Sequence, residues 1–159
     1  MRVMSLVSLL LFLHISITFT AMTVAYAPTI VLWVVYSTRQ VAGIRTVVPV
    51  VARIGLLLPV LFILGGLFGL FTAIAFGYNL LAPWLVIAYV LFAIMMLIGV
   101  TEQRTWPMRL ASTLETTPDG PVTPAIVALF RSPRMLAAEA SSLAIVFLLI
   151  FDMVVKPFS

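Results

Sequence analysis

The sequence predicts an all-α fold, a four-helix bundle that spans a membrane. Hydrophobic residues make up 64% of the 159 residues and charged residues 9%, and the mean hydropathy is +1.26. Soluble domains carry about 25% charged residues, so this composition indicates an integral membrane protein. One helical crossing of the bilayer takes about 20 apolar residues. The chain therefore has length for about three to five spans in one domain, residues 1–159, and a second domain does not fit.

The first span is expected at about residues 3–36, inside a long run without a formal charge. A straight helix of this length would exceed the hydrocarbon thickness of about 30 Å, so we expect it to tilt or to kink at Pro28. The alternative is a signal peptide, because the apolar run is followed by an Ala-x-Ala pattern at residues 25–27. A proline directly after that pattern argues against cleavage, so we expect the span to be retained. Trp33 and Tyr36 fit the aromatic belt of a membrane interface.

The second and third spans are expected at about residues 48–76 and 81–100. Residues 54–101 carry no formal charge, which is enough chain for two crossings. The Gly-Tyr-Asn turn signal at residues 77–79 divides this run, so we predict a tight hairpin of two helices. A connection at about residues 37–46 joins the first span to the second.

A polar cytoplasmic connection at about residues 101–134 leads to the fourth span, at about residues 135–155. Prolines and a glycine make its centre irregular, and its flanks are expected to form short surface helices. Glu139 and Asp152 bound the uncharged centre of the fourth span and are expected near the edges of the hydrocarbon. Asp152 and Lys156 stand four residues apart, the acid first, which favours an ion pair on a helix.

The basic residues predict the orientation of the bundle. The first and third connections carry seven arginines, and the opposite side carries two basic residues. Cytoplasmic loops are enriched in Lys and Arg, so we expect these connections in the cytoplasm and both termini outside. The basic residues are scattered, which favours the anionic headgroups of the lipid bilayer as their partners and argues against nucleic acid. The seven are Arg39, Arg45, Arg53, Arg104, Arg109, Arg131 and Arg134, and the two are Arg2 and Lys156.

Small residues recur every four positions in the second span, at Gly65, Gly69, Ala73 and Gly77. They share one face of the predicted helix and allow another backbone to approach closely. We expect this small-residue seam to pack within the bundle first, and a homodimer contact is the alternative.

His14 is the only histidine of the chain, and ionisable groups inside spans are often functional. It shares a helix face with Thr18, Ala21 and Ala25, and this face is expected to look into the bundle. We favour a neutral side chain that bonds a carbonyl or hydroxyl of a neighbouring helix. The alternative is a ligand to haem or a proton relay. A metal site is disfavoured because a second histidine and cysteine are both lacking.

Other polar side chains of the spans have structural explanations. Ser16, Thr20 and Thr23 are expected to bond the carbonyls four residues earlier or to join neighbouring helices, in preference to lining a pathway. Arg53 and Glu139 are expected to form an ion pair. The sequence contains no motif of a soluble-type catalytic site. A proton-coupled transporter would need Glu139 or Asp152 in a water-filled cavity, and the sequence shows no internal repeat in support of it.

Several short segments resemble a family of uncharacterised bacterial integral membrane proteins with four spans. The resemblance rests on Leu13-His14, the glycine-containing second span, Ala82-Pro83-Trp84-Leu85 and the closing Met-Val-Val-Lys-Pro-Phe at residues 153–158. More distantly, the chain resembles membrane proteins of the copper-resistance D type and the haem-pathway protoporphyrinogen oxidase. The oxidase-like proteins carry further His, Lys and Arg residues in later spans, whereas the third span here has none. The resemblance implies a multi-pass protein of a bacterial plasma membrane.

These observations predict a small helper or accessory subunit without catalysis of its own, which packs against other helices in a larger membrane complex. The runner-up is a haem- or porphyrin-handling redox protein that uses His14 as an axial ligand. Haem is the one cofactor that these hypotheses name.

Overall fold

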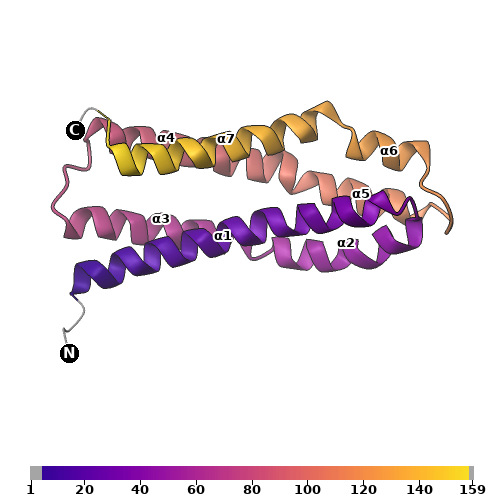
Figure 1. Ribbon diagram of the computed structural model, residues 1–159, viewed down its shortest axis with the longest axis horizontal. Coiled ribbons are helices and arrows are strands. Elements are labelled where there is room, and N and C mark those ends of the chain that lie inside the picture. Colours follow the sequence, from indigo (N-terminus) through magenta and orange to yellow (C-terminus); the bar gives the residue numbers. More distant parts are fainter. Residues whose placement is uncertain (1–4, 158–159) are drawn as a thin grey trace.

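The computed structural model describes residues 5–157, and the long elements of this part of the chain are helices. Four rods of helix lie alongside one another (Figure 1), and each is long and apolar enough to cross a membrane. This confirms the predicted all-α four-helix bundle. The rods are α1 (Leu6–Ser37), α2 (Val41–Gly55) with α3 (Leu58–Ala75), α4 (Pro83–Ile98) with the π-helical segment η1 (Gly99–Gln103) and α5 (Thr105–Glu115), and α6 (Pro124–Phe130) with α7 (Pro133–Val155).

The first rod is one continuous helix, α1, which passes through Pro28 without interruption. The predicted start of this span, at residue 3, lies outside the described residues. The hydroxyls of Thr20 and Thr23 donate to the carbonyls four residues earlier, at 2.8 and 3.0 Å. This confirms the structural explanation of the two side chains, which satisfy their hydrogen-bonding groups within their own helix.

The second rod begins earlier than predicted. Only residues 38–40 separate α1 from α2, so the connection predicted at residues 37–46 is wrong. The reason lies in Val41, Ile44 and Val48, which occupy one face of α2 and are buried. Their spacing of three and four residues gives α2 an apolar stripe that packs as a helix.

The second rod is also divided, so the span predicted at residues 48–76 is not a single helix. The N–H groups of Leu56 and Leu57 bond to carbonyls three residues earlier, at 3.2 and 3.0 Å, which tightens the end of α2. Pro59, in the first turn of α3, has no N–H with which to continue the hydrogen-bond ladder of α2. A short break therefore separates an amphipathic helix, α2, from a uniformly apolar one, α3.

The third rod continues well beyond the span predicted at residues 81–100. It passes through η1, where the Arg104 N–H bonds the Gly99 carbonyl five residues earlier at 3.0 Å, and then becomes α5. The connection predicted at residues 101–134 is therefore mostly helical. Its irregular part is residues 116–123, which agrees with the prolines and glycine seen in the sequence.

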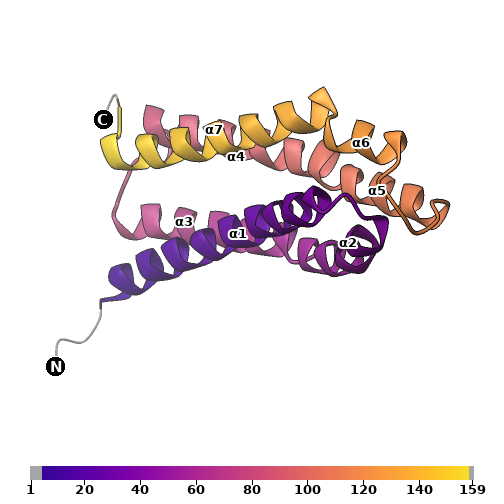
Figure 2. The ribbon, with the colours of Figure 1, turned by 45° about the vertical axis from the view of Figure 1, so that its right-hand side comes forward.

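The rods pack as two layers. α1 packs on α2 and α3, α4 packs on α7, and Figure 2 shows the two groups as separate layers. The predicted tight hairpin of α3 and α4 is wrong, because each of these helices packs mainly on another one. The turn at residues 76–82, with Gly77 at a φ of 73°, carries the chain from one layer to the other. The fourth span, predicted at residues 135–155, agrees with α7.

The main hydrophobic core lies at one end of the bundle, where α2, α5 and α6 meet the last turns of α1. Phe130 stacks on Tyr36 with ring centroids 4.1 Å apart, and Trp33 and Trp106 meet Phe130 edge-on at 5.4 and 5.2 Å. The Trp106 indole N–H donates to the Leu129 carbonyl at 2.9 Å. Trp33 and Tyr36, which the sequence assigns to an interfacial belt, thus pack against Phe130 in this aromatic cluster.

The irregular segment at residues 116–123 is fixed to the same end of the bundle. Two backbone hydrogen bonds, of 2.9 and 3.0 Å, join it to residues 39–41 at the start of α2. Arg45 of α2 pairs with Asp119 and donates to two carbonyls of the α5 end and the segment. One arginine thus satisfies two backbone oxygens at the end of α5 and in the segment.

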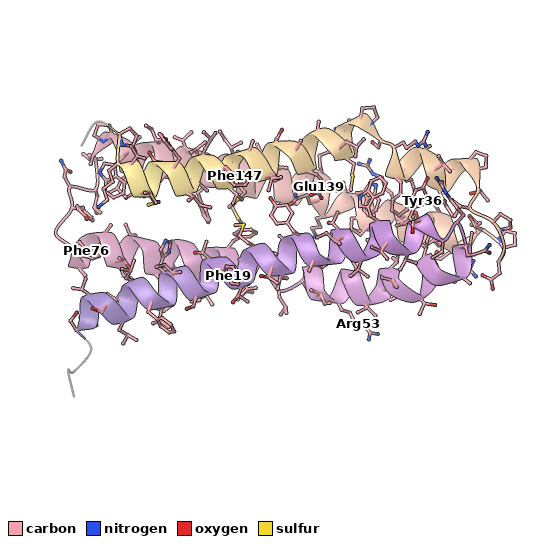
Figure 3. The ribbon with its side chains drawn as sticks, viewed as in Figure 1. Phe19, Tyr36, Arg53, Phe76, Glu139 and Phe147 are labelled. Atoms are coloured by element: carbon pink, nitrogen blue, oxygen red, sulfur yellow. The ribbon has the colours of Figure 1, made fainter. Side chains whose placement is uncertain are left out.

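Arg53 lies beside the second half of α1. Contacts on either side of it in the second rod establish this level, because Gly43 lies against Val35 and Gly65 lies against Thr18. Arg53 falls midway between these two contacts, near the middle of the molecule in Figure 3.

This level divides the molecule into two parts. On the side that holds the start of α1, the turn between α3 and α4 and the end of α7, Asp152 and Lys156 are the only formally charged residues of the described chain. From its start to Ala27, α1 supplies about 33 Å of helix, which matches a hydrocarbon core of about 30 Å. We call this charge-poor part the stem and the remainder, residues 28–53 and 102–139, the head. The main core lies in the head.

Truncation of the head core is expected to destabilise the fold. Phe130→Ala removes a fully buried ring and its three aromatic contacts, and should lower the free energy of unfolding by about 3–5 kcal/mol. Thermal unfolding in mild detergent, followed by circular dichroism, measures the change. Phe147→Ala is the matched control, because Phe147 is 65% exposed on α7 in the stem. Equal losses in the two variants would contradict the assignment of the core.

Candidate functional site

His14 joins α1 to α3 through a single hydrogen bond. Its Nδ1 lies 2.9 Å from the Gly65 carbonyl oxygen. A carbonyl can only accept, so Nδ1 carries the proton and Nε2 keeps its lone pair in the neutral ring. The half-buried imidazole therefore donates its N–H to the backbone of a neighbouring helix. This agrees with the interpretation of His14 as a side chain that bonds a carbonyl within the bundle.

Glycines of α3 create the space for this contact. A Cβ added at Gly69 would lie 2.8 Å from His14 Cε1 and 3.0 Å from its Nδ1, and one added at Gly65 would lie 3.3 Å from Thr18 Oγ1. Both glycines thus face α1 of the same chain. Ala21, on the inner face of α1, is completely buried. The close approach of α1 and α3 depends on small residues, as expected for helices that pack within a membrane.

The other two seam residues lie elsewhere. Ala73 is buried in a small cluster with Trp84 and Leu85 at the start of α4. Gly77 lies beyond the end of α3 in a left-handed conformation, and a Cβ added there would meet no atom within 4 Å. The prediction that all four residues share one helix face therefore fails at Gly77, because its backbone forms the turn.

Arg53 and Glu139 do not form the predicted ion pair. Figure 3 shows Arg53 pointing away from the bundle on the far side of α2, whereas Glu139 lies on α7 in the other layer. Glu139 is half-buried. The pair fails because the two-layer packing separates α2 from α7, which sequence spacing alone does not reveal.

A second pair predicted from the sequence, Asp152 with Lys156, is also wrong. Lys156 has a φ of 48° and ends α7, which directs its side chain to the turn between α3 and α4. There the ammonium donates to the Tyr78 hydroxyl and lies 4.3 Å from the centroid of the Tyr78 ring and 5.3 Å from that of Trp84. Aromatic faces thus take the place of the carboxylate as the cation's partner.

Asp152 is left without a partner in the described part of the chain. Its side chain is 3% exposed, and neither carboxylate oxygen has a hydrogen bond there. A buried acid without a partner is costly in a span. The sequence predicts Asp152 near a hydrocarbon edge, and the structure places it in the last turn of α7 with its side chain buried.

A small polar cluster lies where the stem meets the head, and sequence reasoning did not identify it. Gln103, at the end of η1, donates to the Ser142 hydroxyl of α7 at 3.1 Å. Both residues line a cavity of about 10 Å³ together with Tyr26 of α1, which is room for about one water molecule. π-Helical turns are frequent at functional sites. The signal in the sequence is the polar Gln103 just after an apolar run, which counting charges places in a connection.

The contact of His14 with Gly69 can be tested by a double-mutant cycle. Gly69→Ala should lower the free energy of unfolding by about 1–3 kcal/mol, because the added methyl group overpacks the imidazole. In a His14→Ala background the same substitution should cost much less, since the obstructing ring is gone. Thermal unfolding in detergent measures all four proteins.

Gly55→Ala is the matched control for this cycle, because a Cβ there meets nothing within 4 Å. It should be neutral or slightly stabilising in either background. Additive effects of the Gly69 and His14 substitutions would contradict the proposed contact.

Comparisons of the chain with models of protein families, with curated proteins and with solved structures find no match. The family resemblance of the sequence therefore stays a prediction, and the arguments on function rest on the structure itself.

Proposed function

We propose that this multi-pass membrane protein is an accessory subunit that packs against a helix of a larger membrane protein. The observation that carries the proposal is an apolar ridge on the outer face of α1, which continues from the stem into the head. Its most exposed members are Phe19, at 73%, Ile30, at 61%, and Val34, at 62%.

The ridge is regular along the whole of α1. Its exposed positions recur at intervals of three or four residues, so they form one continuous line on the helix. A partner helix fits such a line along its length, in the manner of a two-helix seam. The members are Phe12, Ile15, Phe19, Thr23, Ala27, Ile30 and Val34.

Lipid can cover only part of this ridge. In the stem, exposed apolar side chains face hydrocarbon and need no other cover. In the head, its members Ile30 and Val34 lie beyond the level of Arg53, where the surroundings are headgroups and water. Exposed apolar patches in that environment mark protein interaction sites. A partner helix that extends past the membrane surface would cover both parts of the ridge at once.

The orientation of the complex follows from the arginines of the head. Their excess on this side of the bundle supports a head in the cytoplasm and both termini outside, in a bacterial plasma membrane. The partner would accordingly have a helix that continues from the membrane into the cytoplasm. A second copy of this chain is the competing occupant of the ridge.

Polar substitutions in the head part of the ridge test this proposal. Ile30→Gln with Val34→Gln should reduce co-purification of a stoichiometric membrane partner by about tenfold or more in mild detergent, because each removes apolar contact area. Met108→Gln is the control, since Met108 is 65% exposed on α5 in the head. A wild-type protein that purifies alone as a monomer would falsify the proposal, and a particle of two identical chains would replace the larger partner by a second copy.

The second candidate, a haem- or porphyrin-handling protein, is favoured by one observation. His14 donates through Nδ1 to a backbone carbonyl, which is how ligating histidines are commonly oriented, with Nε2 left for the iron. Against it, one face of the imidazole is packed on Gly69. Within residues 5–157 no other histidine or cysteine could supply a second axial ligand.

An absorption spectrum separates the two functions. The accessory subunit is expected to be colourless when purified from cells supplied with haem precursors. A Soret band that disappears in His14→Ala but persists in Thr20→Ala would instead establish haem ligation by His14, because Thr20 bonds only within its own helix.

A further inference from the structure

Three arginines on three different rods lie near the junction of stem and head. Arg53 ends α2, Arg104 follows η1, and Arg134 lies in the first turn of α7, and all three are exposed. Arg134 pairs with Glu102 of η1 at 2.7 Å, which places it close to Arg104 along the molecule. Gln103, the neighbour of Arg104, lines the junction cavity. The three arginines therefore surround the stem at about one level, and we call them the arginine collar.

The collar carries positive charge that the described chain does not neutralise. Arg134 has its carboxylate partner, but Arg53 and Arg104 form no ion pair within residues 5–157. The head as a whole holds seven arginines against four carboxylates. The collar is therefore available to an anion from outside the described chain.

The residues next to Arg53 indicate which anion fits. Ile54, Leu56 and Leu57 follow it towards the stem, and all three are exposed. This part of the surface is thus apolar on the stem side and cationic on the head side. A guanidinium forms paired hydrogen bonds with phosphate oxygens, and its stem can lie along apolar surface. A free phosphate would use only the arginine, whereas a phospholipid would use both parts.

We infer that the arginine collar binds the phosphate groups of anionic phospholipids in the leaflet on the side of the head. The acyl chains lie along the apolar surface of the stem, beginning with Ile54 and Leu57, and the phosphates lie against Arg53 and Arg104. Bound lipids of this kind hold the junction at the membrane surface and leave the head outside the hydrocarbon. This inference goes beyond the accessory role and does not depend on it.

Mixed vesicles provide the test. The protein is reconstituted in phosphatidylcholine with a minor fraction of fluorescent phosphatidylglycerol or fluorescent phosphatidylcholine, and energy transfer from its tryptophans gives the relative association of the two lipids. The wild type should prefer phosphatidylglycerol. Arg53→Gln with Arg104→Gln should lower this preference by about 30-fold, because a basic residue near an anionic surface contributes about 1 kcal/mol. High salt should weaken the preference of the wild type.

A second double variant controls for overall charge. Arg109 and Arg131 are exposed in the head, lie outside the collar and have no carboxylate partner in the described chain. Arg109→Gln with Arg131→Gln removes the same charge and should keep most of the preference. The melting temperature of each variant in pure phosphatidylcholine shows that it is folded. An equal loss in both double variants, or a wild type without preference for phosphatidylglycerol, overturns the inference.

Discussion

The mismatch between helix length and membrane thickness governs the structure. The long rods, such as α1, measure about 48 Å, whereas a hydrocarbon core measures about 30 Å. Each of them must therefore continue outside the membrane, where apolar surface meets water and no longer lipid. The amino-acid composition of the helices changes at that level. α3 and α4 are apolar all round, while α2 and α5 are amphipathic and turn their apolar faces inward around Phe130.

The two parts of the molecule consequently obtain stability from different interactions. In the head, burial of Trp106, Tyr36 and Phe130 excludes water, and Arg45 fixes the irregular segment by hydrogen bonds. In the stem, water is absent and close packing replaces the hydrophobic effect. The contact of Gly69 with His14 belongs to this second kind. A methyl group added at Gly69 therefore meets the imidazole of His14 directly, whereas the stability of the head rests mainly on buried apolar side chains.

Sequence reasoning identified the fold class and the positions of the α3–α4 turn and the fourth span, because charge-free runs and turn residues are local signals. It did not find the start of α2 at Val41, because counting charges alone does not distinguish a polar loop from a helix that is buried outside the membrane. The Asp152–Lys156 pair failed because Lys156 ends α7 in a left-handed conformation, and the Arg53–Glu139 pair failed because its residues lie in different layers. Spacing along one helix shows which residues share a face, but not which layer that face meets. Gln103 was missed because its partner, Ser142, lies on another rod.

The same geometry changes where a partner can bind. The small-residue seam of α3 is predicted to pack within the bundle first, with a homodimer contact as the alternative, and Gly65 and Gly69 are covered by α1 of the same chain, in agreement with the first. α1 thus uses its inner face, including His14, for its own bundle. The surface of α1 that is left for a partner is the outer ridge, which is exposed in the described chain and extends past the membrane surface at Ile30 and Val34. An accessory role therefore depends on α1 and not on α3, because the exposed apolar ridge of α1 runs continuously from the stem into the head.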